Sequence, residues 1–296
     1  MVWLRWLRYT LGLINRVIHH MLVSIIKWQQ QCGLPRLESR MLLQAAAGWS
    51  HAFLVGHGDT VLTPELLAQL NALATRRLKG EPMAYIVGER EFYGRVFKVS
   101  PAVLIPRPET ELLVEAVLTR LPEQGKLWDL GTGSGAIALT LALERPDADV
   151  RASDVCANAL ALARENAALL AADLAGKVDW ALGSWFDAAP AAKRAAFDVL
   201  VSNPPYIEAD DAHLSQGDLR FEPAAALTDF GDGLSCIRAL AEGGRHYLRA
   251  GGWLLIEHGF DQGDAARAIL LANGFAEVAT LQDWAGLDRI TLGRWL

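Results

Sequence analysis

The chain has 296 residues, of which 52% are hydrophobic and 21% charged, a composition that excludes disordered, collagen-like and low-complexity proteins. Its 34 Asp and Glu residues outnumber 28 Lys and Arg residues, so the net charge is −6 and the basic excess typical of duplex-binding proteins is absent. Three widely spaced cysteines, Cys32, Cys156 and Cys236, are too few for a disulfide framework or a four-cysteine zinc site. We therefore expect a cytoplasmic protein without a metal.

The first residues differ in composition from the rest of the chain. Residues 1–20 carry three arginines among Trp and Leu and contain no acidic residue. Two interpretations are open, an extension that precedes a start at Met21 and an amphipathic targeting helix. Because no small-residue cleavage site follows, we favour the extension. The apolar run of residues 21–26 lies between Arg16 and Lys27 and is far shorter than the ~20 residues of a membrane-spanning helix, so we expect no membrane span.

Apolar residues recur at helical spacing between residues 37 and 80, and Thr63-Pro64-Glu65 supplies a capping residue, a proline and an acid for the start of one helix. Between residues 82 and 108 the spacing becomes strand-like and is interrupted by Gly88 and Gly94, which predicts a hairpin or linker. We therefore expect a helical domain over residues 1–95, a hairpin linker over residues 96–108 and a second domain over residues 109–296.

From residue 127 onward, short apolar runs alternate with helical patterns. This alternation predicts a doubly wound, mostly parallel α/β sheet of seven strands, of which the last two are the weakest. In such a sheet ligands bind beyond the carboxyl ends of the strands, so the turns after Leu130, Ser153, Ser202 and Glu257 are candidate sites. The five clearest expected strands are residues 127–130, 150–153, 178–182, 197–202 and 253–257. The expected helices are residues 136–143, 157–170, 234–248 and 265–271.

A glycine-rich turn follows the first of these strands. In Asp129-Leu130-Gly131-Thr132-Gly133-Ser134-Gly135 the glycines permit a tight turn and leave backbone N–H groups bare for a ligand at the start of a helix. Asp154 ends the next strand, about 20 residues further on, where a carboxylate would accept hydrogen bonds from ribose hydroxyls. Together these features predict a nucleoside cofactor site.

The turn alone does not identify the cofactor, because with Ala136 it also satisfies the dinucleotide fingerprint. Asp129 would repel a pyrophosphate, whereas it would pair with the ammonium group of S-adenosylmethionine. A second interpretation of Asp129 is that it caps the turn. We favour S-adenosyl-L-methionine as the cofactor and keep a nicotinamide oxidoreductase as an alternative.

A second turn, Asn203-Pro204-Pro205-Tyr206, follows the expected strand of residues 197–202. Its two prolines fix the backbone and contribute no N–H, so the turn offers carbonyl acceptors beside the Asn203 amide oxygen. A planar NH₂ group would donate to Asn203 and to the Pro204 carbonyl while its face lies against the Tyr206 ring. The turn therefore predicts a site for a planar amine or amide nitrogen.

The two turns resemble those of class I S-adenosylmethionine-dependent methyltransferases that act on exocyclic or amide nitrogens, in DNA, ribosomal RNA or protein. Over about residues 35–296, the order of motifs is similar to that of the peptide-chain release factor glutamine methyltransferase (HemK/PrmC) family. Besides the helical domain and the two turns, the motifs are Glu91-Phe92-Tyr93-Gly94, Leu104-Ile105-Pro106-Arg107-Pro108-Glu109-Thr110-Glu111 and Arg220-Phe221-Glu222-Pro223.

This resemblance implies methyl transfer to the side-chain amide nitrogen (N5) of the glutamine in the Gly-Gly-Gln loop of class I peptide-chain release factors, which the helical domain helps to grip. Glutamine of a ribosomal protein, or an exocyclic amine in DNA or rRNA, is the alternative substrate. The acidic net charge agrees with a protein partner, so we expect no direct binding to nucleic acid or membrane. We also expect a monomer, and the intact motifs argue against a non-catalytic binding module.

The resemblance also implies roles for single residues. Gly131 to Gly135, Asp154, Asn203 and Trp185 would bind the cofactor, with Trp185 beside the adenine. The run from Asn203 to Tyr206 would hold the glutamine, with Asn203, Pro204 and Tyr206 as the catalytic residues. From spacing alone, Trp185 is equally consistent with a place in the core. Four residues of these motifs and turns have no assigned role: Glu109, Glu111, Glu222 and His258. For His258 we favour a structural histidine over a general base.

An amide nitrogen is a poor nucleophile because its lone pair is delocalised into the carbonyl group. Positioning is therefore expected to carry much of the rate, since holding the reacting atoms in line lowers a barrier by roughly 7–11 kcal/mol. The Asn203 oxygen and the Pro204 carbonyl would also stabilise positive charge that grows on the NH₂ hydrogens.

Overall fold

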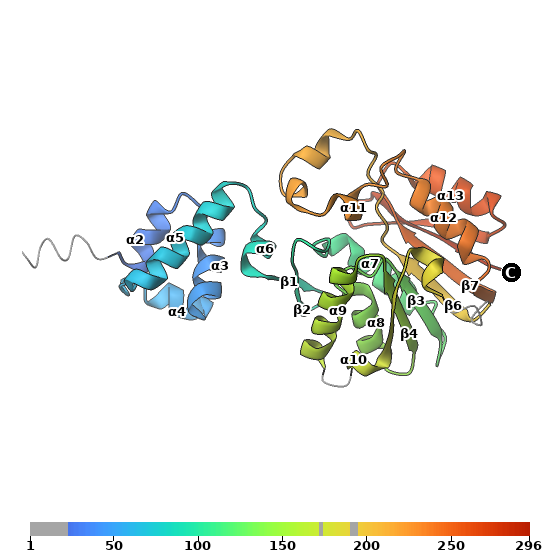
Figure 1. The fold of residues 1–296 in the computed structure, drawn as a ribbon, viewed down its shortest axis with the longest axis horizontal. Helices are drawn as coiled ribbons and strands as arrows, with labels where there is room; N and C mark the ends of the chain where they lie inside the picture. Colours follow the sequence, from blue (N-terminus) through green and yellow to red (C-terminus); the bar gives the residue numbers. More distant parts are fainter. Residues whose placement is uncertain (1–22, 172–173, 190–194) are drawn as a thin grey trace, which may run out of the picture. The chain divides into compact units, whose positions relative to one another are not determined.

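The computed structural model describes residues 23–171, 174–189 and 195–296 (Figure 1). The chain divides into two compact units, one that ends at Val87 and one from Gly88 to Leu296. The expectations for residues 1–20 lie outside the described residues. The limits expected for the helical domain, the hairpin linker and the second domain, residues 1–95, 96–108 and 109–296, stay a prediction.

The first unit is helical. Thr63 caps α5 as predicted, because its hydroxyl accepts the N–H of Leu66 at 3.2 Å and Pro64 occupies the first turn. The strand-like interpretation of Tyr85 is wrong: the N–H groups of Tyr85 and Ile86 bond to the Pro82 carbonyl and start a helical turn. The helices are α2 (Ile25–Gln31), α3 (Arg36–Ala47), α4 (His51–Gly56), α5 (Pro64–Leu78) and α6 (Met83–Val87).

The second unit contains a seven-stranded, mostly parallel sheet, which confirms the predicted fold class. The strand order is β5-β4-β3-β6-β7-β9-β8, and β9 runs antiparallel to both of its neighbours, β7 and β8. The strands are β3 (Lys126–Leu130), β4 (Asp149–Asp154), β5 (Val178–Leu182), β6 (Phe197–Ser202), β7 (Leu248–Glu257), β8 (Ala276–Gln282) and β9 (Asp288–Arg294).

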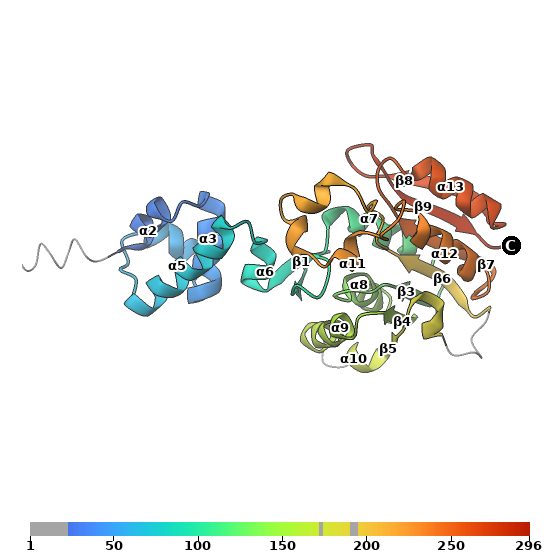
Figure 2. The ribbon, with the colours of Figure 1, turned by 45° about the horizontal axis from the view of Figure 1, so that its top comes forward.

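Helices cover both faces of this sheet (Figure 2). Because strand side chains alternate between faces, Leu127 packs beneath α7 (Glu111–Leu118), α8 (Ala136–Glu144) and α9 (Ala157–Leu170), whereas Trp128 packs beneath α12 (Ser235–Gly244). The helix α13 (Gly263–Ala272) shares the second face. Every residue of β6 is buried, as expected for a central parallel strand covered on both sides.

The elements of the second unit differ from the sequence prediction in several places. The helix expected over residues 234–248 ends at Gly244, and Leu248 begins β7 because it pairs with Phe197 of β6. A pair of glycines, which favours helix ends, precedes this change. The short helix α10 (Leu174–Lys177) and the helix α7 had not been predicted. The strands β1 (Glu89–Phe92) and β2 (Arg95–Lys98) pair antiparallel and form a hairpin.

The strand order reverses between β3 and β6, so the carboxyl ends of these two strands lie side by side at the switch point where doubly wound sheets bind ligands. The Ser202 hydroxyl donates to the Leu130 carbonyl at 2.7 Å and ties the two ends together. The glycine turn and the Asn203 turn therefore start from adjacent points. Within the described ranges, no helix is long and apolar enough to cross a membrane.

Candidate functional site

A cavity of about 500 Å³ lies at this carboxyl edge of the second unit. Its wall includes residues that follow four neighbouring strands, β3, β4, β5 and β6. The predicted site residues on the wall are Gly131, Thr132, Gly133, Ser134, Asp154, Trp185, Asn203 and Pro205. The structure therefore brings together residues from both turns and from the ends of β4 and β5.

The glycine turn is held by backbone hydrogen bonds. The N–H groups of Gly131 and Thr132 both donate to the Ser153 carbonyl at 2.9 Å. Gly133 and Gly135 have φ angles of +55° and +82°, which favour glycine. A Cβ on Gly135 would lie 2.9 Å from Leu139, so this glycine allows α8 to pack closely, whereas a Cβ on Gly133 would meet nothing within 4 Å. Gly133 thus leaves open space at the cavity wall. The expectation of bare N–H groups is wrong for the three glycines and Thr132, because their N–H groups all bond within the protein.

Asp154 holds a fixed position at the end of β4. One carboxylate oxygen accepts the N–H of Gly133 at 2.8 Å and the other accepts the N–H of Cys156 at 2.8 Å. Burial raises the pKa of Asp154 above its ordinary value, although both hydrogen bonds oppose that shift. Each carboxylate oxygen has a second lone pair for a ligand hydroxyl.

Asp129 lies behind the glycine turn and is completely buried. The Thr132 hydroxyl donates to Asp129 Oδ2 at 2.6 Å, while Oδ1 accepts no hydrogen bond from the described residues. Burial raises the pKa of this carboxyl to about 7. Asp129 does not line the cavity, and its contact with Thr132 is a turn-stabilising one. Its pairing with an ammonium group stays a prediction.

Trp185 has one side in the core and contributes to the cavity wall. It packs against the hydrophobic cluster beneath α12, and its ring lies against Gly131, where a Cβ would be 3.6 Å away. It begins the 3₁₀ helix η2 (Trp185–Ala188) with a φ of +42°, uncommon for a residue with a side chain. The core interpretation therefore describes part of its surroundings, and its place beside the adenine stays a prediction.

Asn203 directly follows β6, and both hydrogens of its side-chain amide are used. Nδ2 donates to the Thr110 hydroxyl at 3.1 Å and to Glu257 Oε1 at 2.9 Å. The Oδ1 atom is buried and accepts no hydrogen bond from the described part of the chain. Asn203 lines the cavity, and its amide oxygen has no partner among the described residues. The sequence analysis did not identify Thr110 and Glu257 as partners of Asn203.

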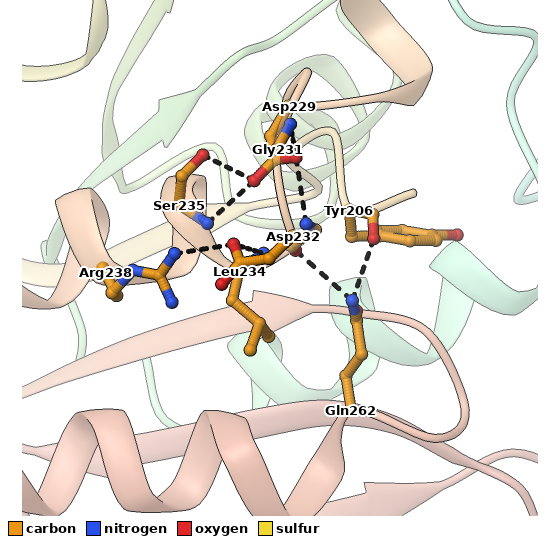
Figure 3. Close-up of polar contacts among 9 residues, drawn as sticks. Tyr206, Asp229, Gly231, Asp232, Leu234, Ser235, Arg238 and Gln262 are labelled. Carbon is orange, nitrogen blue, oxygen red and sulfur yellow. Dashed lines mark hydrogen bonds and ion pairs between the residues drawn. The ribbon is translucent and has the colours of Figure 1, made fainter. Parts of the chain in front are cut away.

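The remaining residues of this turn are placed differently. Pro205 lines the cavity, whereas Pro204 is buried and Tyr206 is half-buried, and neither is on the wall. Gln262, just before α13, donates to the Tyr206 carbonyl at 2.9 Å and to the Gly233 carbonyl at 3.3 Å (Figure 3). A Cβ on Gly233 would lie 2.5 Å from the Tyr206 carbonyl oxygen. The backbone of the turn is therefore held by a close contact with residues 229–235.

Asp229 organises this neighbouring segment and also lines the cavity. Its carboxylate accepts the N–H groups of Gly231, Gly233 and Ser235 and the Ser235 hydroxyl, at 2.5–3.0 Å (Figure 3). Although burial acts to raise the pKa of Asp229, these hydrogen bonds lower it below its ordinary value. The turn-forming run of Asp and Gly residues around Asp229 was a sequence signal that the prediction did not use.

Glu222 and Glu111, to which the sequence analysis assigned no role, connect segments around the site. Glu222 is buried, accepts the N–H of Ile105 at 3.0 Å and pairs with Arg107, which lines the cavity. Glu111 accepts the N–H of Tyr93 at 2.8 Å and holds the hairpin. Arg107 belongs to the motif that begins at Leu104, and with Leu104 and Pro106 it forms a part of the cavity wall that spacing alone could not reveal.

His258 is completely buried next to the site. Its Nδ1 bonds to the Gly259 carbonyl at 2.8 Å, so this nitrogen carries the hydrogen, and Nε2 bonds to the Thr291 hydroxyl at 2.8 Å. Burial lowers the pKa of His258 and keeps the ring neutral. With both nitrogens in use, this geometry favours the structural interpretation over a general base.

Comparisons with known proteins agree with this arrangement. Residues 29–88 match the family model described as PrmC N-terminal domain, and residues 108–231 match that of the methyltransferase small domain. A solved methyltransferase from Pyrococcus furiosus shares the fold with a TM-score of 0.51 and 18% identity, covering 74% of this chain and 95% of that one.

Closer relatives cover nearly the whole chain. The release factor glutamine methyltransferase of Neisseria gonorrhoeae is 58% identical over 270 residues, which is 91% of this chain and 97% of that protein. Proteins of the same name from Bordetella pertussis and Escherichia coli are 50% and 44% identical and cover 88% and 93% of this chain and 95% and 98% of their own lengths. The chain therefore belongs to the family of release factor glutamine methyltransferases.

Proposed function

We propose that this protein transfers a methyl group from S-adenosylmethionine to the side-chain amide nitrogen of the glutamine in the Gly-Gly-Gln loop of class I peptide-chain release factors. The observation that carries this proposal is the unpartnered amide oxygen of Asn203, a residue on the wall of the cavity that the glycine turn also lines. The relatives named release factor glutamine methyltransferases support the choice of substrate.

The residues on one side of the cavity fit S-adenosylmethionine. Gly133 leaves space for a close approach to the backbone, and the fixed carboxylate of Asp154 has lone pairs for the two ribose hydroxyls. Trp185 offers an aromatic surface for the adenine. When bound, this cofactor supplies an electrophilic methyl group on a sulfonium centre. A cavity of about 500 Å³ lies within the range of cofactor sites.

Asn203 fits an amide substrate because the group it offers is an acceptor. A glutamine NH₂ would donate one hydrogen to Asn203 Oδ1, which would otherwise be a buried polar atom without a partner. The proposed second acceptor is the Pro204 carbonyl, with Tyr206 against the amide face. Positive charge that grows on the NH₂ hydrogens would be stabilised by these fixed acceptors, and the released proton can leave after the transfer.

The rest of the proposal concerns the partner and the compartment. We propose that the protein acts in the cytoplasm as a monomer, with the helical first unit contributing to the grip on the release factor. A net charge of −6 supports a protein partner over direct binding to nucleic acid.

The test is transfer of labelled methyl from S-adenosylmethionine to a purified release factor. A factor with its loop Gln→Ala, a ribosomal protein fraction, and a pool of DNA and RNA serve as parallel substrates. We expect label in the wild-type factor and none in the loop variant. Label in ribosomal protein or nucleic acid instead would contradict the proposed substrate. In a separate titration, fluorescence quenching by a nicotinamide cofactor would contradict the assignment of S-adenosylmethionine as the cofactor.

A further inference from the structure

The Asn203 side chain is held by two elements that are distant in sequence. Thr110 ends the 3₁₀ helix η1 (Pro108–Thr110), and Glu257 ends β7. Because Ser202 of β6 pairs in register with Ile256, the next residues, Asn203 and Glu257, lie side by side at the edge of the sheet. The side chain of Glu257 is almost fully buried and is not part of the cavity wall, so it acts on Asn203 and not directly on a ligand.

The chemistry of these partners gives the Asn203 amide one direction. An ionised carboxylate only accepts hydrogen bonds, so the group that faces Glu257 Oε1 at 2.9 Å must be the NH₂ of Asn203. The Thr110 hydroxyl accepts the other hydrogen at 3.1 Å and lies close enough to Glu257 to lower its pKa by donating to it. Turning the amide by half a rotation would place its oxygen against the carboxylate and its NH₂ where the oxygen now lies.

We propose that Glu257, together with Thr110, is a positioning residue that fixes the Asn203 amide with its oxygen toward the substrate. The site then accepts a group that donates N–H, such as the glutamine amide, and rejects one that presents oxygen, such as a glutamate carboxylate. Donation to a carboxylate also polarises the Asn203 amide and makes Oδ1 a stronger acceptor. This inference rests on the proposed function for the identity of the substrate, but the direction of the amide is tested without it.

The charge on Glu257 is sensitive to its surroundings. Burial raises the pKa of Glu257 to about 7, and the nearby Glu109 adds to this, whereas Arg289 on β9 and the hydrogen bonds from Thr110 and Asn203 lower it. The charge of Glu257 in turn adds to the raised pKa of Tyr206. A protonated Glu257 no longer forbids the reversed amide, so the preferred direction is held above pH 7 and relaxes as the pH falls.

The first experiment observes the Asn203 side-chain amide directly by NMR of the full-length protein. Its NH₂ signals are assigned by their loss in Asn203→Ala, and the Asn273 amide, which donates to the Ile269 carbonyl at 2.9 Å, is the internal reference. At pH 8 we expect both Asn203 hydrogens to be protected from exchange. In Glu257→Gln their exchange should be about tenfold faster, while Asn273 does not change. Equal exchange at Asn203 in the two proteins would overturn the proposal.

The second experiment measures methyl transfer to a release factor. We expect Glu257→Gln to lower kcat about tenfold while KM for the factor and the Kd of S-adenosylmethionine stay within about twofold. The wild-type kcat should fall as the pH is lowered through about 7, and this dependence should be absent from Glu257→Gln. An unchanged kcat, or a pH profile like that of the wild type, would contradict the positioning role.

Matched variants separate positioning from stability. Thr110→Val should lower kcat as Glu257→Gln does, whereas Thr110→Ser keeps the hydroxyl and should retain it. Asp198→Asn changes a buried carboxyl at the opposite end of the sheet, beside Lys126, and should leave kcat unchanged. A wild-type protein that protects the Asn203 amide but methylates no release factor would overturn the proposed function and leave the amide direction standing.

Discussion

The glycine turn after β3 is held by groups of β3 itself and of the end of the adjacent strand β4, whereas the Asn203 turn after β6 is held by side chains from other elements. Gly131 and Thr132 bond to the end of the adjacent strand β4. The Asn203 side chain bonds to residues 93 and 54 positions away in sequence. The Tyr206 carbonyl depends on Gln262, 56 positions away.

This difference separates two kinds of site. A turn that binds with its backbone tolerates many side chains as long as its glycines allow the conformation. A turn that binds through one side chain depends on the groups that orient that side chain. We therefore expect substitutions in the glycine turn to affect mainly cofactor affinity, and substitutions around Asn203 to affect mainly the rate of transfer.

The largest effect is expected for Asn203→Ala. Loss of the Oδ1 acceptor removes both orientation of the substrate amide and stabilisation of the charge that develops on it, so methyl transfer should fall by about 10² or more. The Kd of S-adenosylmethionine, measured by calorimetry, should stay close to that of the wild type. Full activity in this variant would contradict the proposed role of the turn.

The next largest effect is expected on the affinity for the cofactor. Asp154→Ala removes the acceptor for the ribose hydroxyls and the partner of the Gly133 N–H, so the Kd of S-adenosylmethionine should rise about 10- to 100-fold. Asp149→Ala, at the other end of the same strand, is the control and should bind normally. Calorimetry decides the outcome, and an unchanged affinity of Asp154→Ala would exclude the ribose assignment.

A smaller effect is expected where Gly233 packs against the Tyr206 carbonyl of the Asn203 turn. Gly233→Ala places a Cβ 2.5 Å from the Tyr206 carbonyl oxygen at a φ of +74°, so the turn must shift, and kcat should fall about tenfold. In Gly231→Ala the nearest atom would be 3.6 Å away, which makes this variant a matched control. Equal kcat values for the two variants would show that the contact with Tyr206 is unimportant.

The last effect concerns the stability of the protein and its dependence on pH, and not the rate of transfer. Because burial raises the pKa of Asp129 from 3.8 to about 7, the stabilisation that its neutral form contributes is lost as the pH rises from about 4 to 7. Asp129→Asn removes this dependence. Relative to the wild type, the free energy of unfolding of the variant should increase by up to a few kcal/mol between pH 5 and 7 and then level off. Denaturant unfolding at several pH values measures this difference, and a difference independent of pH would contradict it.

Much of the fold was predictable because it depends on local patterns. The seven-stranded sheet follows from alternation of apolar runs and helices, and the start of α5 follows from Thr63 and Pro64. The predictions failed where pairing between distant strands overrides local preference. Leu248 is a strand residue because it meets Phe197, and no nearby residue signals this.

The sequence by itself determined the two binding turns, since glycine and proline restrict the backbone through covalent geometry at the residues concerned. It also determined the family, through motifs whose order along the chain can be read directly. Only the tertiary structure decided the direction in which Asn203 presents its oxygen. That direction depends on Thr110 and Glu257, which the register of β6 with β7 and the placement of η1 bring to the same point.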